Sequence, residues 1–187
     1  MIILGVDGSL SCTGVAVLDV GSPGRETLIG TGTIRTKPTD GDDVDRYIRI
    51  ARAVVALARK HRADLVALEM PYVDPAKSND VALRLAGLDA VIRVFCRLAG
   101  IEVVTVAASS RTKALGVKGR HVERKELKAR ARAQVASRYS VDVRTDDEAD
   151  AVGVALAGYA KWRRGPEPEQ LQLAVRAGNK RSSNRSQ

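Results

Sequence analysis

The 187-residue chain has few cysteines, few aromatic residues and no long apolar run. Its two cysteines, Cys12 and Cys96, form no Cys-x-x-Cys motif, which argues against a cysteine-based zinc site or a disulfide framework and fits a reducing cytoplasm. Aromatic residues make up 3% of the chain, too few for a general base-stacking platform. The first apolar run breaks at Asp7, too early for a signal peptide, and no run is long enough for a membrane span. We therefore expect a cytoplasmic protein.

Basic residues are in excess and are concentrated in two blocks. Lys and Arg number 31 against 22 Asp and Glu, which gives a net charge of +9. Residues 111–138 hold ten basic and two acidic residues, and residues 161–187 hold seven and two. This excess favours a polyanionic partner, nucleic acid above all. The alternative is that the basic residues of 111–138 only form a solvated helix face.

The apolar pattern predicts an α/β fold with a five-stranded mixed sheet flanked by helices. The expected strands are 2–6, 13–20, 27–36, 65–68 and 102–106. The expected helices are 44–59, 79–98, a short one after 108, 122–139 and 146–164. In the first helix the predicted buried positions are Val44, Ile48, Ala51, Val55 and Ala58, with Arg46 on the solvent side. Residues 1–164 then form one domain, and 165–187 a basic, disordered tail.

Carboxylates stand where the predicted elements would bring them together. Asp7 and Glu69 each end an apolar strand, and ligands in α/β sheets gather at the carboxyl ends of strands. Asp147 and Asp150 lie three residues apart near the start of the last helix, where Thr145 and Glu148 predict a capping box. Four such oxygen donors suit Mg²⁺, and paired ions can drive hydrolysis of a phosphodiester.

Each acidic residue also has a simpler interpretation when it is considered alone. The role of Asp7 could be limited to stabilising the turn that follows it, since Asp is common in turns. Asp147 could only favour the dipole of the helix in whose first turn it lies. Four carboxylates in one cleft would repel one another and DNA, however, so a metal-free cluster beside a basic surface is difficult to explain as structure alone.

Four segments together resemble the RuvC family of Holliday junction resolvases, within the ribonuclease H-like nucleases. They are Ile-Leu-Gly-Val-Asp-Gly-Ser-Leu-Ser-Cys-Thr-Gly from Ile3, Val-Ala-Leu-Glu-Met-Pro-Tyr from Val66, the lysine-bearing region near Lys113 and Lys125, and Asp-Glu-Ala-Asp-Ala-Val from Asp147. The resemblance implies a ribonuclease H-like fold and metal-dependent cleavage of four-way DNA junctions by a homodimer. It also implies a bacterial or phage-infected cell and Mg²⁺ as the cofactor, for which Mn²⁺ substitutes.

The resemblance assigns roles to individual residues. The four metal ligands fall on Asp7, Glu69, Asp147 and Asp150, two functional lysines fall on Lys113 and Lys125, and the aromatic residue that helps open the junction falls on Tyr72. The helix 79–98 is the expected dimer contact. The further basic residues that we interpret as phosphate contacts are Arg111, Lys118, Arg120, Arg124 and Lys128.

Several other functions remain open from the sequence. One is a nuclease for RNA–DNA hybrids or other branched DNA. A second is a junction-binding module without catalysis on the same fold. A third is an ATP-binding protein of the actin and sugar-kinase type, because Asp7-Gly8-Ser9 is similar to a phosphate-binding hairpin, although the chain offers no second hairpin of this kind.

Overall fold

A five-stranded mixed sheet forms the centre of the protein. The computed structural model describes residues 1–21, 24–71, 79–117 and 122–165. The strand order is β3-β2-β1-β4-β5, with β1 (Ile2–Asp7) in the middle. β1 pairs antiparallel with β2 (Cys12–Asp19) and parallel with β4 (Leu65–Glu69). The edge strands are β3 (Thr27–Arg35), antiparallel to β2, and β5 (Glu102–Val106), parallel to β4. The predicted mixed sheet is confirmed.

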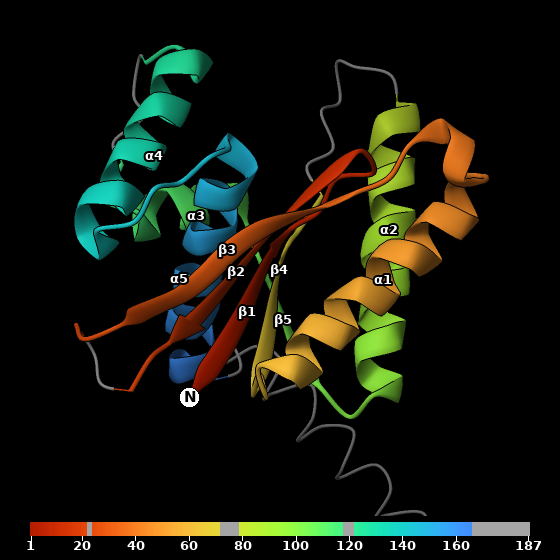
Figure 1. Ribbon diagram of the computed structural model, residues 1–187, viewed down its shortest axis with the longest axis horizontal. Coiled ribbons are helices and arrows are strands. Elements are labelled where there is room, and N and C mark those ends of the chain that lie inside the picture. The colour runs from red at the N-terminus through yellow and green to blue at the C-terminus, as the bar shows by residue number, and fades with distance from the viewer. Residues whose placement is uncertain (22–23, 72–78, 118–121, 166–187) are drawn as a thin grey trace, which may run out of the picture.

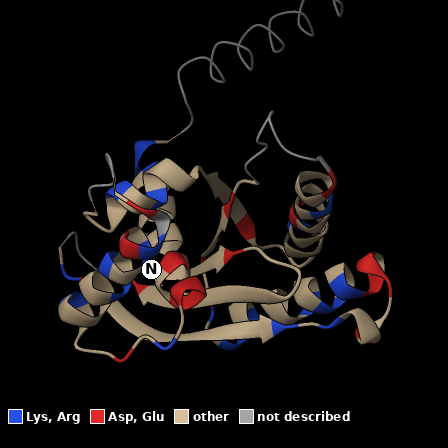
Figure 2. Ribbon diagram, turned by 90° about the horizontal axis from the view of Figure 1, so that it is seen from above, with Lys and Arg blue, Asp and Glu red and all other residues tan. Residues whose placement is uncertain are grey.

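Helices cover both faces of the sheet (Figure 1). α1 (Asp43–Lys60), preceded by a 3-10 turn at Pro38–Asp40, and α2 (Asn79–Leu98) lie on one side. α3 (Ala108–Ala114), α4 (Arg124–Tyr139) and α5 (Asp146–Arg164) lie on the other. Seen from above, a group of acidic stretches lies toward the middle of the molecule, with basic stretches on helices to either side (Figure 2).

The alternation of side chains along the strands divides the core into two layers. On β1, Ile3 packs with the α5 layer, whereas Leu4 and Val6 pack with α1 and α2. Because the central strands are buried on both faces, their sequences are continuous apolar runs rather than alternating ones. This explains why each run ends abruptly at the residue where the strand leaves the core.

α5 approaches the sheet unusually closely because glycines stand beneath it. A Cβ on Gly5 of β1 would lie 2.2 Å from the carbonyl oxygen of Ala151, and one on Gly14 of β2 would lie 2.0 Å from that of Asp147. The buried middle of α5 is itself rich in small residues, including Ala151 and Ala155. The helix backbone therefore rests directly on the strand backbones, which fixes the position of its first turns.

The first helix is rotated from its predicted orientation. The buried positions of α1 are Arg46, Tyr47, Ile50, Ala51, Val54 and Ala58. Val44, which the sequence pattern placed in the core, is 56% exposed. The prediction that Arg46 faces solvent is wrong, because its guanidinium finds buried acceptors: Nε donates to Thr36 Oγ1 at 3.0 Å and Nη2 donates to the Leu10 carbonyl at 3.1 Å.

The capping box predicted for the last helix is confirmed in part. The Asp42 side chain caps α1, and Thr145 Oγ1 caps α5 by accepting from the Glu148 backbone N–H at 3.2 Å. The capping box differs, because the Glu148 carboxylate accepts from the Arg144 backbone N–H at 3.0 Å, one residue before the cap. α4 begins at Arg124 rather than at residue 122. Residues 166–187 of the predicted tail lie outside the described residues, so that boundary stays a prediction.

Among the described residues, no helix combines the length and the apolar character needed to cross a membrane.

We expect Gly5→Ala to destabilise the protein by about 3 kcal/mol or more, because the new methyl group would overlap the α5 backbone. Urea unfolding measures the free energy of unfolding of each protein. Gly30→Ala is the matched control, since Gly30 lies in β3 of the same sheet and a methyl group there would meet no atom within 4 Å. Equal stability of the two variants would contradict the close packing of α5 on β1.

Candidate active site

Asp7 and Glu69 meet because the strands that carry them are parallel neighbours. Val6 is in register with Leu68, so the next residues, Asp7 and Glu69, end β1 and β4 at the same edge of the sheet. Ile3 and Leu65, four residues earlier in each strand, belong to the layer of the core that packs on α5. Since strand side chains alternate with a period of two, both carboxylates point to the α5 face.

The first turns of α5 bring two more carboxylates to this edge. Gly14 is the cross-strand partner of Asp7, and the carbonyl of Asp147 lies against Gly14. Asp147 and Asp150 accordingly line the same cleft as Asp7 and Glu69. The predicted convergence of these four acidic residues in one cleft is what the structure shows, and the role of each as a ligand stays a prediction.

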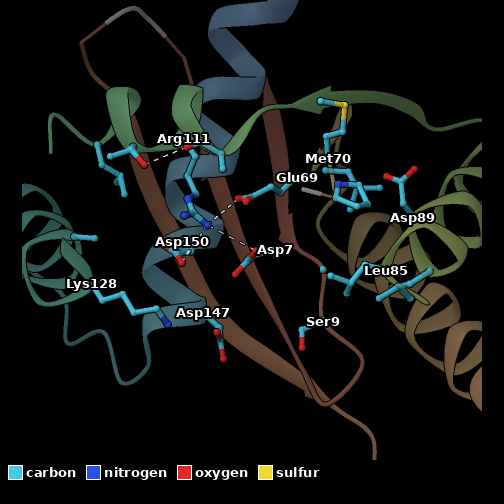
Figure 3. Close-up of a pocket in the computed structure, with 18 of the residues that line it drawn as sticks. Asp7, Ser9, Glu69, Met70, Leu85, Asp89, Arg111, Lys128, Asp147 and Asp150 are labelled. Carbon is cyan, nitrogen blue, oxygen red and sulfur yellow. Dashed lines mark hydrogen bonds and ion pairs between the residues drawn. The ribbon is translucent and has the colours of Figure 1, made fainter. Parts of the chain in front are cut away.

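Arg111 reaches into the carboxylates from α3. Its Nη1 lies 2.8 Å from Glu69 Oε2, 3.1 Å from Asp150 Oδ2 and 3.9 Å from Asp7 Oδ1 (Figure 3). α3 begins two residues after β5 ends, and β5 runs parallel to β4, so the first turn of α3 lies at the same edge of the sheet. Arg111 therefore lies largely buried among the acids, and its predicted contact with a DNA phosphate stays a prediction.

Burial and like charges shift the protonation of this cluster. Burial, together with the Glu69 and Asp150 carboxylates, raises the pKa of Asp7 to about 7, and Arg111 opposes only part of that shift. Burial likewise raises the pKa of Glu69 and that of Asp150 above their ordinary values, again against the influence of Arg111. One guanidinium thus compensates incompletely for three neighbouring acids.

The acids form one wall of a cleft of about 600 Å³. The opposite wall comes from α2, which contributes Leu85, Leu88 and Asp89. Met70, the residue after Glu69, is 54% exposed at the rim. The cleft is thus polar and acidic on the side of α5, and largely apolar on the side of α2.

The predicted basic residues are only partly brought to the cleft. Lys128 lines it, and its Nζ lies 3.3 Å from Asp146 Oδ2. Lys113 and Lys125 are exposed and are not among the lining residues. Arg111, rather than Lys113, is the cation that α3 directs at the acids. The residues whose placement falls outside the described part are Tyr72, Lys118, Arg120 and the side chain of Arg124.

Sequence reasoning missed two further features of the site. Asp89 lines the cleft, and its buried Oδ1 has no hydrogen-bond partner among the described residues, while its Oδ2 lies 3.4 Å from Arg93 Nη1. An Asp four residues before an Arg in a helix is typical of a surface ion pair, so no pattern in the chain marks Asp89 as part of a site. The second feature is the buried Arg46, which holds the Leu10 carbonyl and so anchors the β1–β2 turn that follows Asp7.

The donor set fits a hard divalent cation. All four acids offer oxygen, the ligand atom that Mg²⁺ and Mn²⁺ prefer. Three of them already converge on one cationic atom, Nη1 of Arg111, which acts as a stand-in for an ion. Among the described residues, no group of three or more Asp, Glu, His or Cys side chains is arranged so that it could hold a metal ion without some rearrangement.

Comparison with known proteins identifies the family. The model of the crossover junction endodeoxyribonuclease RuvC family matches residues 3–158. The chain belongs to the RuvC family. A RuvC from Halorhodospira halophila is 31% identical over 88% of this chain and 92% of its own length. One from Salinispora arenicola is 32% identical over 95% of this chain and 97% of its own.

Solved structures of RuvC and other resolvases share the fold. Thermus thermophilus RuvC in complex with Holliday junction substrate superposes with a TM-score of 0.70, at 21% identity, over 88% of this chain and 97% of the other. A fowlpox virus resolvase in complex with Holliday junction DNA gives a TM-score of 0.55, at 18% identity, over 84% and 95%. These matches confirm the predicted ribonuclease H-like fold. Nucleases of the RuvC family are metal-dependent.

The raised pKa of Asp7 predicts how stability depends on pH when metal is absent. Between about pH 4 and pH 7 the unfolded chain releases the Asp7 proton while the folded protein keeps it, so folding becomes less favourable as pH rises. Asp7→Asn should not show this loss of stability. Its free energy of unfolding, relative to that of the unmodified protein, should therefore rise by roughly 2–3 kcal/mol between pH 5 and pH 8. Urea unfolding in EDTA measures the gain. If the difference in the free energy of unfolding between the two proteins is the same at both pH values, the pKa of Asp7 is not raised in the folded protein.

Proposed function

We propose that the protein is a metal-dependent endodeoxyribonuclease that resolves four-way DNA junctions by paired hydrolysis of phosphodiesters. The observation that carries this proposal is the meeting of Asp7, Glu69, Asp147 and Asp150 in one cleft, from segments far apart in the chain. The relatives that cover most of this chain are named crossover junction endodeoxyribonucleases. Two proteins with this fold have been solved with Holliday junction DNA, which supports the same substrate here.

The four acidic residues would hold Mg²⁺, with Mn²⁺ as its substitute. When bound, the ions supply an activated water and stabilise the leaving oxygen of the phosphodiester. The chain's own contribution is positional: adjacent parallel strands fix Asp7 and Glu69, and the close packing of α5 fixes Asp147 and Asp150. Side chains that are held in place in this way need little rearrangement when substrate arrives.

Basic residues around the cleft would bind the DNA backbone. Lys128 is at the wall of the cleft, and Lys125 is exposed three residues earlier on α4. Lys113 is exposed on α3, in the same basic block. Contacts of this kind with phosphates position DNA without reading its sequence, which suits an enzyme that recognises the shape of a junction. Tyr72 stays a predicted contact with an unpaired base.

A homodimer would place two such clefts on one junction, and α2 is the proposed contact. Its inner side packs on α1 and the cleft, while large apolar side chains remain exposed on the outer side. They are Leu83 (67% exposed), Val94 (54%) and Leu98 (82%), and their helical spacing places them on one stripe. Apolar side chains that are exposed along one stripe are typical of a protein contact surface.

Cleavage of labelled DNA tests the proposed activity. We expect the protein to cut a four-way junction in Mg²⁺ or Mn²⁺ and not in EDTA. Asp7→Asn should lower the cleavage rate by at least about 100-fold, because a proposed ligand is lost, while junction binding is kept or slightly strengthened by the removal of a negative charge. Asp19→Asn, at the opposite end of the same hairpin and 45% exposed, is the control and should cut normally.

The same assay with other substrates separates the remaining functions. If the protein cleaves three-way, flap or RNA–DNA hybrid substrates faster than the four-way junction, the four-way junction is not its preferred substrate. Junction binding without cleavage in either metal would show a binding module. ATP turnover in the absence of DNA would favour the actin and sugar-kinase type. Normal cutting by Asp7→Asn would refute the assignment of the acidic site.

Val94→Asp should weaken the dimer by at least about 100-fold, because it buries a charge in an apolar contact. Analytical ultracentrifugation over a range of concentrations measures the dissociation constant. Val44→Asp is the matched control, since Val44 is an equally exposed valine (56%) on α1. If both variants dimerise like the unmodified protein, α2 is not the contact surface.

A further inference from the structure

Arg111 is built into the carboxylate cluster, and its side chain is only 18% exposed. Two interactions hold it there. The guanidinium lies within 4 Å of Glu69, Asp150 and Asp7. The aliphatic stem passes over Gly153 of α5, where a Cβ would lie 2.7 Å from Arg111 Cγ. The lack of a side chain at Gly153 thus makes room for the stem of Arg111.

The positive charge of Arg111 lies in the space that a bound cation would need. A single nitrogen, Nη1, makes all three of the contacts with carboxylates. A divalent cation shared by these carboxylates would need to lie in the same space, between the same oxygens. The guanidinium and the metal therefore cannot both occupy the centre of the cluster.

We propose that Arg111 is a resident counter-cation, which holds the metal-free site together and which the metal must displace. This inference rests on the proposed metal-dependent function. It goes further in giving Arg111 two opposed effects: the residue stabilises the fold without metal and lowers the affinity of the site for metal. A cation thereby lies between the carboxylates in both states, first the guanidinium of Arg111 and then the bound ion.

Displacing the guanidinium of Arg111 lowers the affinity of the site for metal. Metal binding must break three contacts between charged groups in a mostly buried site, and such contacts are stronger than those at an open surface. Any free energy that Arg111 contributes to the metal-free state is subtracted from the free energy of metal binding. We therefore expect removal of the guanidinium to tighten metal binding by about tenfold or more.

Arg111→Met and Lys113→Met form a matched pair for the test. Both remove one positive charge from α3 and keep an unbranched stem, but only Arg111 contacts the acids, while Lys113 is exposed. Calorimetry or electron paramagnetic resonance of free Mn²⁺ measures the affinity of each protein without DNA. Melting in EDTA measures the stability of the metal-free fold.

The expected result has two parts. Arg111→Met binds Mn²⁺ at least about tenfold more tightly than the unmodified protein and melts at a lower temperature in EDTA, whereas Lys113→Met changes neither. Equal or weaker Mn²⁺ binding by Arg111→Met would overturn the inference. Should Arg111→Met fail to fold, Arg111→Gln provides the same comparison. Absence of Mn²⁺ binding by every variant and by the unmodified protein would instead refute the proposed metal-dependent function.

Discussion

The fold holds several carboxylates close together although their charges repel one another. Asp7, Glu69 and Asp150 lose part of their hydration, which raises the pKa of each, and the charges of Glu69 and Asp150 raise the pKa of Asp7 further. A flexible surface would relieve this repulsion by letting the side chains separate. Here the acids cannot separate, because two lie at the ends of paired strands and α5 rests directly on the strand backbones at Gly5. The rigid fold therefore holds an arrangement that is unfavourable until a cation neutralises it.

The features that the sequence predicted best are those that depend on continuous burial. A strand covered on both faces must be apolar throughout, so an acidic residue at its end marks both the end of the strand and the edge of the sheet. That is why Asp7 and Glu69 could be identified from two short runs. Their common face could also have been predicted, since each lies an even number of residues after a buried position of the α5 layer, Ile3 and Leu65 respectively.

The features that the sequence did not predict depend on contacts between distant segments. Arg111 and Lys113 are two residues apart on α3, and only the packing of that helix on α5 decides which of them faces the acids. Arg46 is buried because its guanidinium finds acceptors at Leu10 and Thr36, and no periodicity reveals them. In α1 the buried face is shifted, with Tyr47 inside and Val44 outside, although Ala51 and Ala58 are buried as predicted. Long cationic side chains are the least predictable, because their stems tolerate burial when the head finds a partner.

α2 contributes to the cleft on one side and carries the proposed dimer contact on the other. Its inner side supplies Leu88 and Asp89 to the wall of the cleft, and its outer side carries the apolar stripe of Leu83 and Val94. A partner subunit bound to that stripe would fix the wall of each cleft and the separation of the two clefts through the same rigid element. Paired hydrolysis needs both conditions, since each site must meet its own strand of one junction. In a dimer built on α2, one rigid element would therefore serve both conditions.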